Sequence, residues 1–464
     1  MWGLPFLLLP ALLVAMDISV LFVASPAMTA ALAPSATEWL WMMDVYGFVM
    51  AGLLVTMGSL GDRIGRKRLL LAGAALFGVA SVGVAYASSP AAVIASRAVL
   101  GVAAATLAPS TLSLIRGMVP DETRRRRAVG AWTVAFTGGA VAGPIVGGLL
   151  LEHFWWGSVF LVNVPVMAVL LIGVPFLVPE SCDPRPAPFD LPGAALSLVA
   201  VLALVFAVKH TVEGGWDAAS TVAAATAVAA GALFLRGQTL VDIGLFRRPA
   251  FAAAVGANTV VAFATAGLGL LAFTYLQAVR GLGPLEAALW AAPTFAGTLA
   301  GATAGATLKL RPGILVPTGL VVGAAGFAVV GLAGPESSLV VFVGGYTVLT
   351  LGVGVVGTVA NALVLTTAPA DRAGAAAGVS ETSMELGAAL GIATLGTVAS
   401  AVYRSAMRRA GARGPAAETV TAAGGDVAAS AAYTTGLGVA ALTGAAVLLA
   451  VAVAAATALR RTPA

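Results

Sequence analysis

Fourteen long apolar segments divide this chain of 464 residues and constrain its fold more than any other feature. An α-helix of about 20 apolar residues crosses the hydrocarbon core of a bilayer. Lipid offers no hydrogen-bond partners, so a spanning segment must satisfy its own backbone groups, as a helix does. The sequence therefore predicts an all-α integral membrane protein with fourteen transmembrane helices. The segments cover residues 6–26, 40–60, 69–88, 91–115, 128–151, 159–178, 191–209, 220–235, 252–276, 286–308, 314–333, 339–366, 373–402 and 432–458.

Composition excludes a soluble protein. Only 10% of the residues are charged and 59% are hydrophobic, whereas soluble chains carry about 25% charged residues. The first apolar segment has no basic residue before it and contains Asp17. We therefore expect it to be the first span and not a cleaved signal peptide.

The distribution of lysine and arginine predicts the orientation in the membrane. If the N-terminus is cytoplasmic, 18 of the 25 basic residues fall in inside loops and six fall outside, with Arg97 within a span. Positive charge concentrates on the cytoplasmic side of membrane proteins, so we expect both termini to be cytoplasmic. The exception is the outside loop at 403–431, which carries four arginines. The net charge of +5 thus follows from topology, and no nucleic-acid partner is expected.

Metal and thiol chemistry have little support in the sequence. Cys182 is the single cysteine, which excludes an intramolecular disulfide and a CxxC metal site. The two histidines, His153 and His210, fall at the ends of apolar segments. We expect no metal site, and a membrane-embedded enzyme is disfavoured because no histidine lies within a span.

Five ionisable residues lie within the spans and are the candidate proton- and substrate-binding residues. The acids are Asp17, Asp44, Glu381 and Glu385, the last two one helical turn apart in "GVSETSMELGAALG", and Arg97 is the only base. Charges at this depth are costly and mark ion or substrate pathways. A structural ion pair with Arg97 is the alternative. One arginine cannot neutralise four acids, however, so some must bind protons or an incoming cation.

The stretch "GSLGDRIGRKRLLL" (58–71) predicts a gating loop on the cytoplasmic side. Its glycines permit close approach of helices, and its charges can hold neighbouring helix ends together. We expect it to latch the inward side when the protein faces outward. The candidate gating residues are Gly58, Asp62, Arg63, Gly65 and Arg66.

The stretch "GGAVAGPIVGGLL" (138–150) predicts close helix packing. Glycines spaced by four residues make a flat groove on one helix face, and proline permits a bend. The candidate residues are Gly139, Gly143, Pro144, Gly147 and Gly148.

These motifs resemble those of a known family. The order G-x-L-x-D-R-x-G-R-K resembles the signature loop of the major facilitator superfamily, and G-x-x-x-G-P-x-x-G-G resembles its antiporter motif. The stretch "MDISVLFVASP" (16–26) is similar to the first-span motif of fourteen-span drug:proton antiporters, with Ser19 and Phe22 where the family has Thr and Asn. The resemblance covers nearly the whole chain and is greatest to the exporters of methyl viologen, quaternary ammonium compounds and, above all, fluoroquinolones.

The resemblance implies a fold of two six-helix bundles with two inserted helices. The expected parts are residues 1–178, a linker with two inserted helices at 179–251, and residues 252–464. A degenerate echo of the gating loop, "TLKLRPG" (307–313), fits an internal repeat of the kind found in this architecture.

The resemblance further implies proton-driven efflux of lipophilic, often cationic compounds across the bacterial inner membrane. The expected partners are small-molecule drugs, protons and the lipid bilayer, and the expected state is a monomer. No cofactor is expected, because the proton gradient supplies the energy. Three alternatives stay open: a dedicated exporter of one secondary metabolite, a passive channel, and a membrane enzyme.

Overall fold

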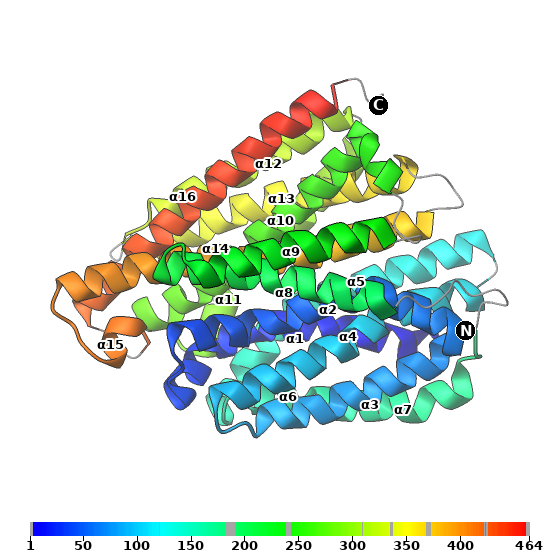
Figure 1. Cartoon of the computed structure of the whole chain (residues 1–464), viewed down its shortest axis with the longest axis horizontal. Coiled ribbons are helices and arrows are strands. Elements are labelled where there is room, and N and C mark those ends of the chain that lie inside the picture. Colours follow the sequence, from blue (N-terminus) through cyan, green and yellow to red (C-terminus); the bar gives the residue numbers. More distant parts are fainter. Residues whose placement is uncertain are drawn as a thin grey trace. The chain divides into compact units, whose positions relative to one another are not determined.

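The computed structural model describes residues 3–119, 121–181, 191–237, 243–308, 310–334, 337–367, 373–421, 423 and 426–460. These residues form helices and no strand. The helices of each part run roughly side by side (Figure 1). Their bounds are α1 Leu4–Leu32, α2 Ala36–Ile64, α3 Arg66–Ala85, α4 Pro90–Met118, α5 Glu122–His153, α6 Ser158–Leu161, α7 Asn163–Leu177, α8 Leu191–Gly214, α9 Ala218–Gly237, the 3₁₀ helix η1 Ile243–Arg247, α10 Pro249–Thr274, the π-helix η2 Tyr275–Val279, α11 Pro284–Thr307, α12 Pro312–Gly331, α13 Leu339–Thr367, α14 Ala373–Arg409, α15 Pro415–Glu418 and α16 Val427–Ala458.

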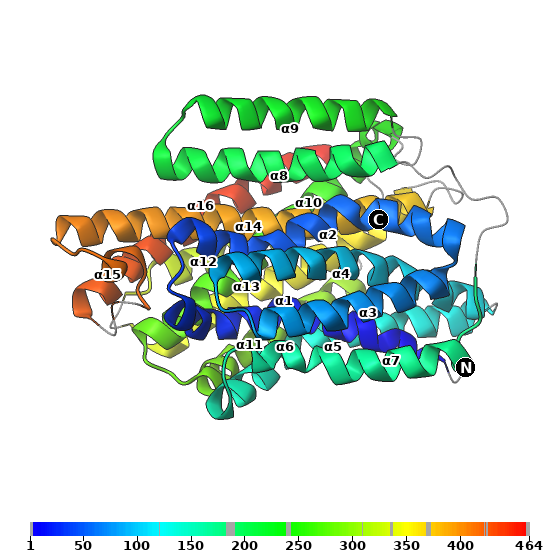
Figure 2. The same ribbon diagram turned by 60° about the horizontal axis from the view of Figure 1, so that its bottom comes forward.

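Each apolar segment of the sequence coincides with helix in the described part of the chain, and α6 and α7 together form the sixth. Ten helices are long and apolar enough to cross a membrane. An eleventh is α2, which bends by 55° between Glu38–Leu54 and Thr56–Ile64. Helices α8 and α9, joined by a short turn (Figure 2), contain shorter apolar stretches. The all-helical membrane fold is confirmed, and the total of fourteen spans stays a prediction.

The chain divides into two compact units. Unit 1 comprises Met1–Leu198 and Gly283–Ala288, and unit 2 comprises Val199–Leu282 and Leu289–Ala464. The three-part division expected from the resemblance, with its boundaries after residues 178 and 251, stays a prediction.

The two units use the same order of helix pairs. In unit 1, α1 packs on α5 and α4, and α3 packs on α4 and α7. In unit 2, α10 packs on α14 and α13, and α12 packs on α13 and α16. The two sets of pairs are the same when α1, α3, α4, α5 and α7 are matched to α10, α12, α13, α14 and α16. This correspondence supports the internal repeat that the sequence indicated.

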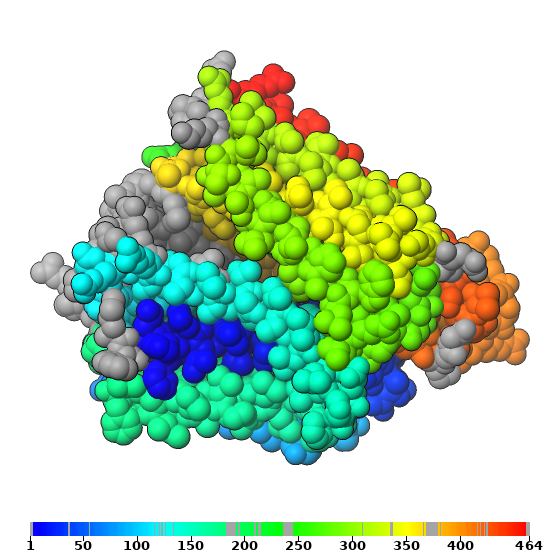
Figure 3. Space-filling view, turned by 180° about the vertical axis from the view of Figure 1, so that it is seen from behind, coloured from blue at the N-terminus to red at the C-terminus, as the bar shows by residue number. Residues whose placement is uncertain are grey.

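Glycines of the expected antiporter motif allow α5 to approach α1 closely. A Cβ atom on Gly139 would overlap the carbonyl oxygen of Leu12, and one on Gly143 would overlap the Ser19 hydroxyl and lie 2.8 Å from the Met16 carbonyl oxygen. Figure 3 shows α1 (blue) between α5 (cyan) and α7 (green) on this face of unit 1. The backbone of α1 is therefore fixed against α5 along the length that carries Asp17.

The α10–α14 pair of unit 2 is built in the same way. A Cβ on Gly387 would overlap the carbonyl oxygen of Thr259, and one on Gly391 would overlap that of Phe263. The four-residue spacing on both helices equals that of the α1–α5 pair. Small residues at this spacing let two membrane helices pack through van der Waals contact, since lipid supplies no hydrophobic drive for association.

We predict that Gly143→Leu destabilises unit 1, because its side chain has no space between α5 and α1. Overpacking of this kind costs roughly 1–3 kcal/mol. The measurement is thermal unfolding of the purified protein in detergent. The matched control is Gly138→Leu on the same helix, where a Cβ meets nothing within 4 Å. Equal melting temperatures for the two variants would contradict the packing role.

Candidate functional site

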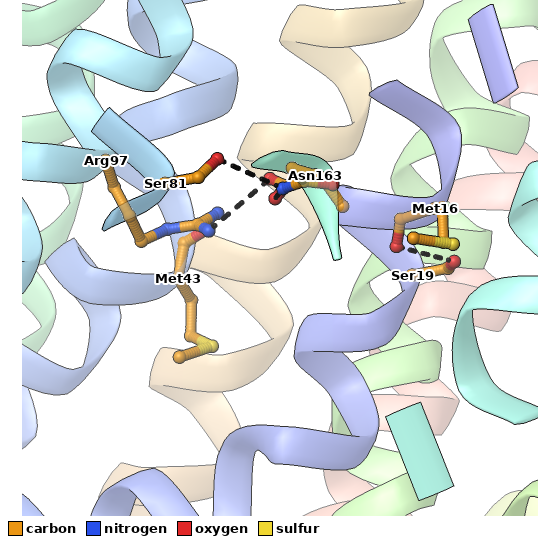
Figure 4. Close-up of polar contacts among 7 residues, drawn as sticks. Met16, Ser19, Met43, Ser81, Arg97 and Asn163 are labelled. Carbon is orange, nitrogen blue, oxygen red and sulfur yellow. Dashed lines mark hydrogen bonds and ion pairs between the residues drawn. The ribbon is translucent and has the colours of Figure 1, made fainter. Parts of the chain in front are cut away.

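Asp17 lies near the middle of α1, inside unit 1, and is 1% exposed. The Asn163 side chain donates a hydrogen bond of 3.1 Å from Nδ2 to Asp17 Oδ1. The same nitrogen donates to the Ser81 hydroxyl oxygen at 3.2 Å. The other carboxylate oxygen, Oδ2, lies 3.8 Å from Nη1 of Arg97. Figure 4 shows Arg97, Ser81 and Asn163 pointing toward one another from three helices.

Arg97 is the largest fully buried side chain of the described residues and is 1% exposed. Its guanidinium lies 5.3 Å from the centre of the Tyr46 ring, a distance at which the ring face attracts a cation. Its Nη2 donates to the Met43 carbonyl oxygen at 3.5 Å. Within the described chain, Nε and Nη1 make no hydrogen bond. The ion pair with Asp17 is therefore loose, although it is shielded from solvent.

Asp44 completes the charged cluster. It lies on α2, is 1% exposed and interacts electrostatically with Arg97. We use "unit 1 charge cluster" for Asp17, Asp44, Arg97 and Asn163. With both carboxylates ionised the cluster has a net charge of −1, and one added proton makes it neutral. Because an uncompensated buried charge is costly, this arrangement has a physical reason to bind one proton.

The cluster draws one side chain from each of several helices. Asp17 comes from α1, which the glycines of α5 hold in place. Arg97 comes from α4 and Asp44 from α2. Asn163 is the first residue of α7, directly after the break that separates α7 from α6. The site therefore depends on the packing of the whole unit.

The structure brings together three of the five ionisable residues that the sequence singled out. Asp17, Asp44 and Arg97 share the unit 1 charge cluster. Glu381 and Glu385 lie one turn apart on α14, in unit 2. Glu385 is buried, with 9% of its surface exposed. The side chain of Glu381 lies outside the described residues.

The internal repeat places an alanine in unit 2 at the position that Asp17 has in unit 1. Asp17 follows Met16 on α1, and the residue that follows the corresponding Phe263 on α10 is Ala264. The repeated packing therefore surrounds an acid in unit 1 and an alanine in unit 2. The two units share a scaffold and differ in charge.

A neutral polar network in unit 2 was missed by the sequence reasoning. The Asn258 side chain donates to Asn361 Oδ1 at 2.8 Å and to the Ser380 hydroxyl at 3.0 Å. This network joins α10, α13 and α14, and its member Ser380 directly precedes Glu381 in the sequence. A signal was present: the chain has three asparagines, Asn163, Asn258 and Asn361, and each interrupts an apolar segment.

The predicted gating loop is helical except at one residue. Helix α2 continues through Asp62 to Ile64, and α3 begins at Arg66. The turn is confined to Gly65, whose φ of +105° suits glycine. Gly58 lies within α2, where an added Cβ would lie 3.8 Å from Pro109. Arg63 is exposed.

Two acids make contacts at the α2–α3 turn. Asp62 Oδ1 accepts from Arg66 Nε at 2.7 Å, across the turn. The acid at the N-terminus of α3 is Glu180, which accepts from the Lys67 backbone N–H at 2.9 Å. The N–H groups of a first helical turn favour a carboxylate. Sequence reasoning missed Glu180 because it is 113 residues from its partner in the chain.

Three glycines of the expected antiporter motif, Gly139, Gly143 and Gly147, face α1, and Gly148 faces Leu285. Gly147 would overlap Val20 if it carried a Cβ, and Gly148 meets Leu285, which belongs to the same compact unit. Pro144 lies inside α5, which stays helical on both sides of it. The glycines therefore hold the helix that carries Asp17, which gives this motif a direct structural link to the charge cluster.

Comparisons with known proteins agree with this architecture. LfrA, described as a multidrug efflux pump of Mycolicibacterium smegmatis, is 45% identical over 87% of this chain and 81% of its own length. SmvA of Salmonella typhimurium, described as a methyl viologen resistance protein, is 35% identical over 85% of this chain and 81% of its own.

A solved structure supports the fold. The crystal structure of a bacterial homologue of the human lysosomal transporter Spinster matches with a TM-score of 0.71, at 18% identity, over 99% of this chain and 96% of that one. The family model described as Major Facilitator Superfamily matches residues 7–392. The helix pairing, the sequence relatives and this match together show that the chain is a multi-pass membrane protein of the major facilitator superfamily.

Proposed function

We propose that this chain is a proton-coupled multidrug efflux antiporter that exports lipophilic, often cationic compounds. The observation that carries the proposal is the unit 1 charge cluster, in which two buried carboxylates face one buried guanidinium. Its charge changes from −1 to zero when one proton binds. The 45% identity to LfrA supports drugs as the substrate class. We infer that the protein is located in the bacterial inner membrane, that both its termini are cytoplasmic, and that it works as a monomer.

The mechanism follows from the cost of buried charge. From the outward-open state a proton reaches Asp17 and neutralises the cluster, which lowers the cost of closing the site away from water. From the inward-open state the proton leaves and a cationic drug can replace it as the compensating charge. A proton gradient directed inward then drives export, and no cofactor takes part.

Glu385 and Glu381 supply negative charge on α14 for cationic substrates. Glu385 is buried, so an approaching cation is a favourable partner for its carboxylate. The network of Asn258, Asn361 and Ser380 holds α14 against α10 and α13 near this point. We assign these acids to substrate selection and the unit 1 charge cluster to proton coupling.

The α2–α3 turn acts as a gating element in this proposal. The Asp62–Arg66 pair and the Glu180 contact to α3 fix the turn in the state described here. Breaking them is one of the energetic costs of changing state.

A dedicated exporter of one secondary metabolite is the alternative. LfrA and SmvA, whose descriptions name multidrug efflux and methyl viologen resistance, favour the broader range. Survival of a pump-deleted bacterial host on a panel of cationic biocides, dyes, quinolones and unrelated antibiotics separates the two. Protection against one compound alone would favour the alternative.

We predict that Asp17→Asn abolishes proton-coupled efflux, because the amide cannot take up or release the proton. The measurement is drug-induced proton release from purified protein together with dye efflux from energised cells. Asp217→Asn is the control, since Asp217 is an exposed acid in the α8–α9 turn. Hydrogen bonds from the Ser220 backbone N–H, His210 and the Ser220 hydroxyl lower the pKa of Asp217 to about 2. Proton release at the normal level from Asp17→Asn would refute the coupling role.

We predict that the double variant Glu381→Gln/Glu385→Gln loses export of dications before export of monocations. Two positive charges lose more interaction energy than one when the carboxylates are neutralised. The measurement is efflux of a monocationic and a dicationic dye at matched expression. Export of both dyes at the wild-type rate would leave these acids with a structural role only.

We predict that Glu180→Gln speeds efflux about fivefold, because breaking the weakened contact costs ~1 kcal/mol less, the amount that a helix-capping interaction contributes. The amide accepts the Lys67 N–H more weakly and loses its favourable charge at the helix N-terminus. Glu152→Gln, at an exposed acid near the end of α5, is the control. Identical efflux from both variants would show that the Glu180 contact does not affect the rate.

A further inference from the structure

The neutral polar network of unit 2, formed by Asn258, Asn361 and Ser380, fixes the orientation of one side-chain amide. Asn258 Nδ2 donates to Asn361 Oδ1 at 2.8 Å and to the Ser380 hydroxyl at 3.0 Å. The Ser380 hydroxyl donates in turn to Asn361 Oδ1 at 3.4 Å. The carbonyl oxygen of Asn361 therefore accepts from two side chains, and its amide nitrogen is left for another partner.

The opposite orientation of both amides is less favourable. Asn258 is fully buried, and its carbonyl oxygen has no hydrogen-bond partner among the described residues. If both amides were turned over, this oxygen would accept from Asn361 and Ser380, but the two N–H groups of Asn258 would be buried without a partner. Two unpaired buried donors cost more than one unpaired acceptor. Asn361 therefore presents N–H groups and not its carbonyl oxygen.

Asn361 presents this nitrogen on an exposed part of a membrane-spanning helix. The residue lies within the apolar span Leu339–Val364 of α13 and is itself exposed. Its Nδ2 makes no hydrogen bond within the described part of the chain. Lipid hydrocarbon would leave both N–H groups without a partner, which is costly. The exposed amide is therefore suited to a water-lined surface, where an oxygen atom of a ligand can take the place of water.

The network lies at the end of unit 2 that the proposed orientation makes cytoplasmic. Asn258 and Ser380 each lie in the third turn of their helices, α10 and α14. Asn361 lies within two turns of the end of α13. Glu381 directly follows Ser380 in the sequence, and Glu385 lies one turn further along α14. Neutral hydrogen-bond donors and negative charge thus occur at the same end of this unit.

We propose that Asn361 is a substrate-recognition residue whose amide donates to a carbonyl or carboxylate oxygen of the exported compound. The favoured substrates then combine such an oxygen with a cationic group, because the acids of α14 attract the cation while the amide binds the oxygen. Asn258 and Ser380 are positioning residues, since they act on the substrate through Asn361. The proposal rests on the proposed function, because it narrows the class of compounds that the protein exports.

Two dyes that differ in one group provide the test. Tetramethylrhodamine has a xanthene cation and a carboxylate, and tetramethylrosamine has the same cation without the carboxylate. The measurements are the dissociation constant of each dye for the purified protein, by fluorescence, and the efflux of each dye from energised cells. The ratio of the two dissociation constants cancels any effect that a variant has on the cation alone.

Asn361→Asp keeps the oxygen that accepts from Asn258 and replaces the outward N–H groups with a second oxygen. We expect binding of tetramethylrhodamine to weaken roughly tenfold relative to tetramethylrosamine, the loss expected for one hydrogen bond to a charged group. Asn361→Leu, which adds no charge, should change the ratio in the same direction. Thr366→Val is the matched control, because Thr366 is exposed on the same helix and its hydroxyl bonds within α13.

The outcomes separate this proposal from the proposed function. An unchanged ratio in both Asn361 variants, with both dyes exported by the wild-type protein, would overturn the recognition role and leave the proposed function standing. Failure of the wild-type protein to export either dye would overturn both.

Asn258→Leu tests the positioning role. This variant removes the donor that fixes the amide of Asn361, so the amide can present either end to the substrate. We expect the ratio of dissociation constants to change in the same direction as in Asn361→Asp, and by less. A purely structural role of Asn258 would weaken the binding of both dyes equally, and an unchanged ratio would therefore overturn the positioning role.

Discussion

Arg97 places a positive charge inside a helical unit, away from water, and much of unit 1 is organised to make this tolerable. Its attraction to Asp17 acts over 3.8 Å in surroundings where solvent screens little. The ring of Tyr46 and the Met43 carbonyl oxygen add weaker compensation. Two carboxylates against one guanidinium leave the group one charge away from neutrality. In the proposed function, that imbalance is the reason why the cluster takes up a proton.

Glycine packing and charge placement depend on each other in this protein. The charge cluster requires α1 to hold Asp17 at a fixed height, and α5 can approach closely enough to do so because Gly139 and Gly143 lack side chains. The equivalent glycines Gly387 and Gly391 hold α10 in unit 2. The repeated scaffold is thus independent of the charge, and one copy of it has an acid where the other has an alanine.

The sequence predicted the helices well because membrane spanning imposes a strong local rule on length and polarity. It also identified Asp17, Asp44 and Arg97, since ionisable residues are conspicuous in apolar segments. The sequence could not predict that these three residues lie together, because that depends on how three distant segments pack. Asn163 and Glu180 were missed for related reasons. One is neutral, and the other lies in a charged linker where acids are ordinary.

The single-residue connection between α2 and α3 has a mechanical consequence. One residue spans less than about 4 Å of chain, so the end of α2 cannot be displaced without carrying the start of α3 with it. A displacement of this kind needs a flexible point within α2 as well, and the helix offers one at its 55° bend, before Thr56–Ile64. Thr56–Ile64 of α2, Gly65 and α3 would then move together about this bend, which lies inside the apolar region. Motion at that hinge would reach the surface as a displacement of the arginine-rich turn.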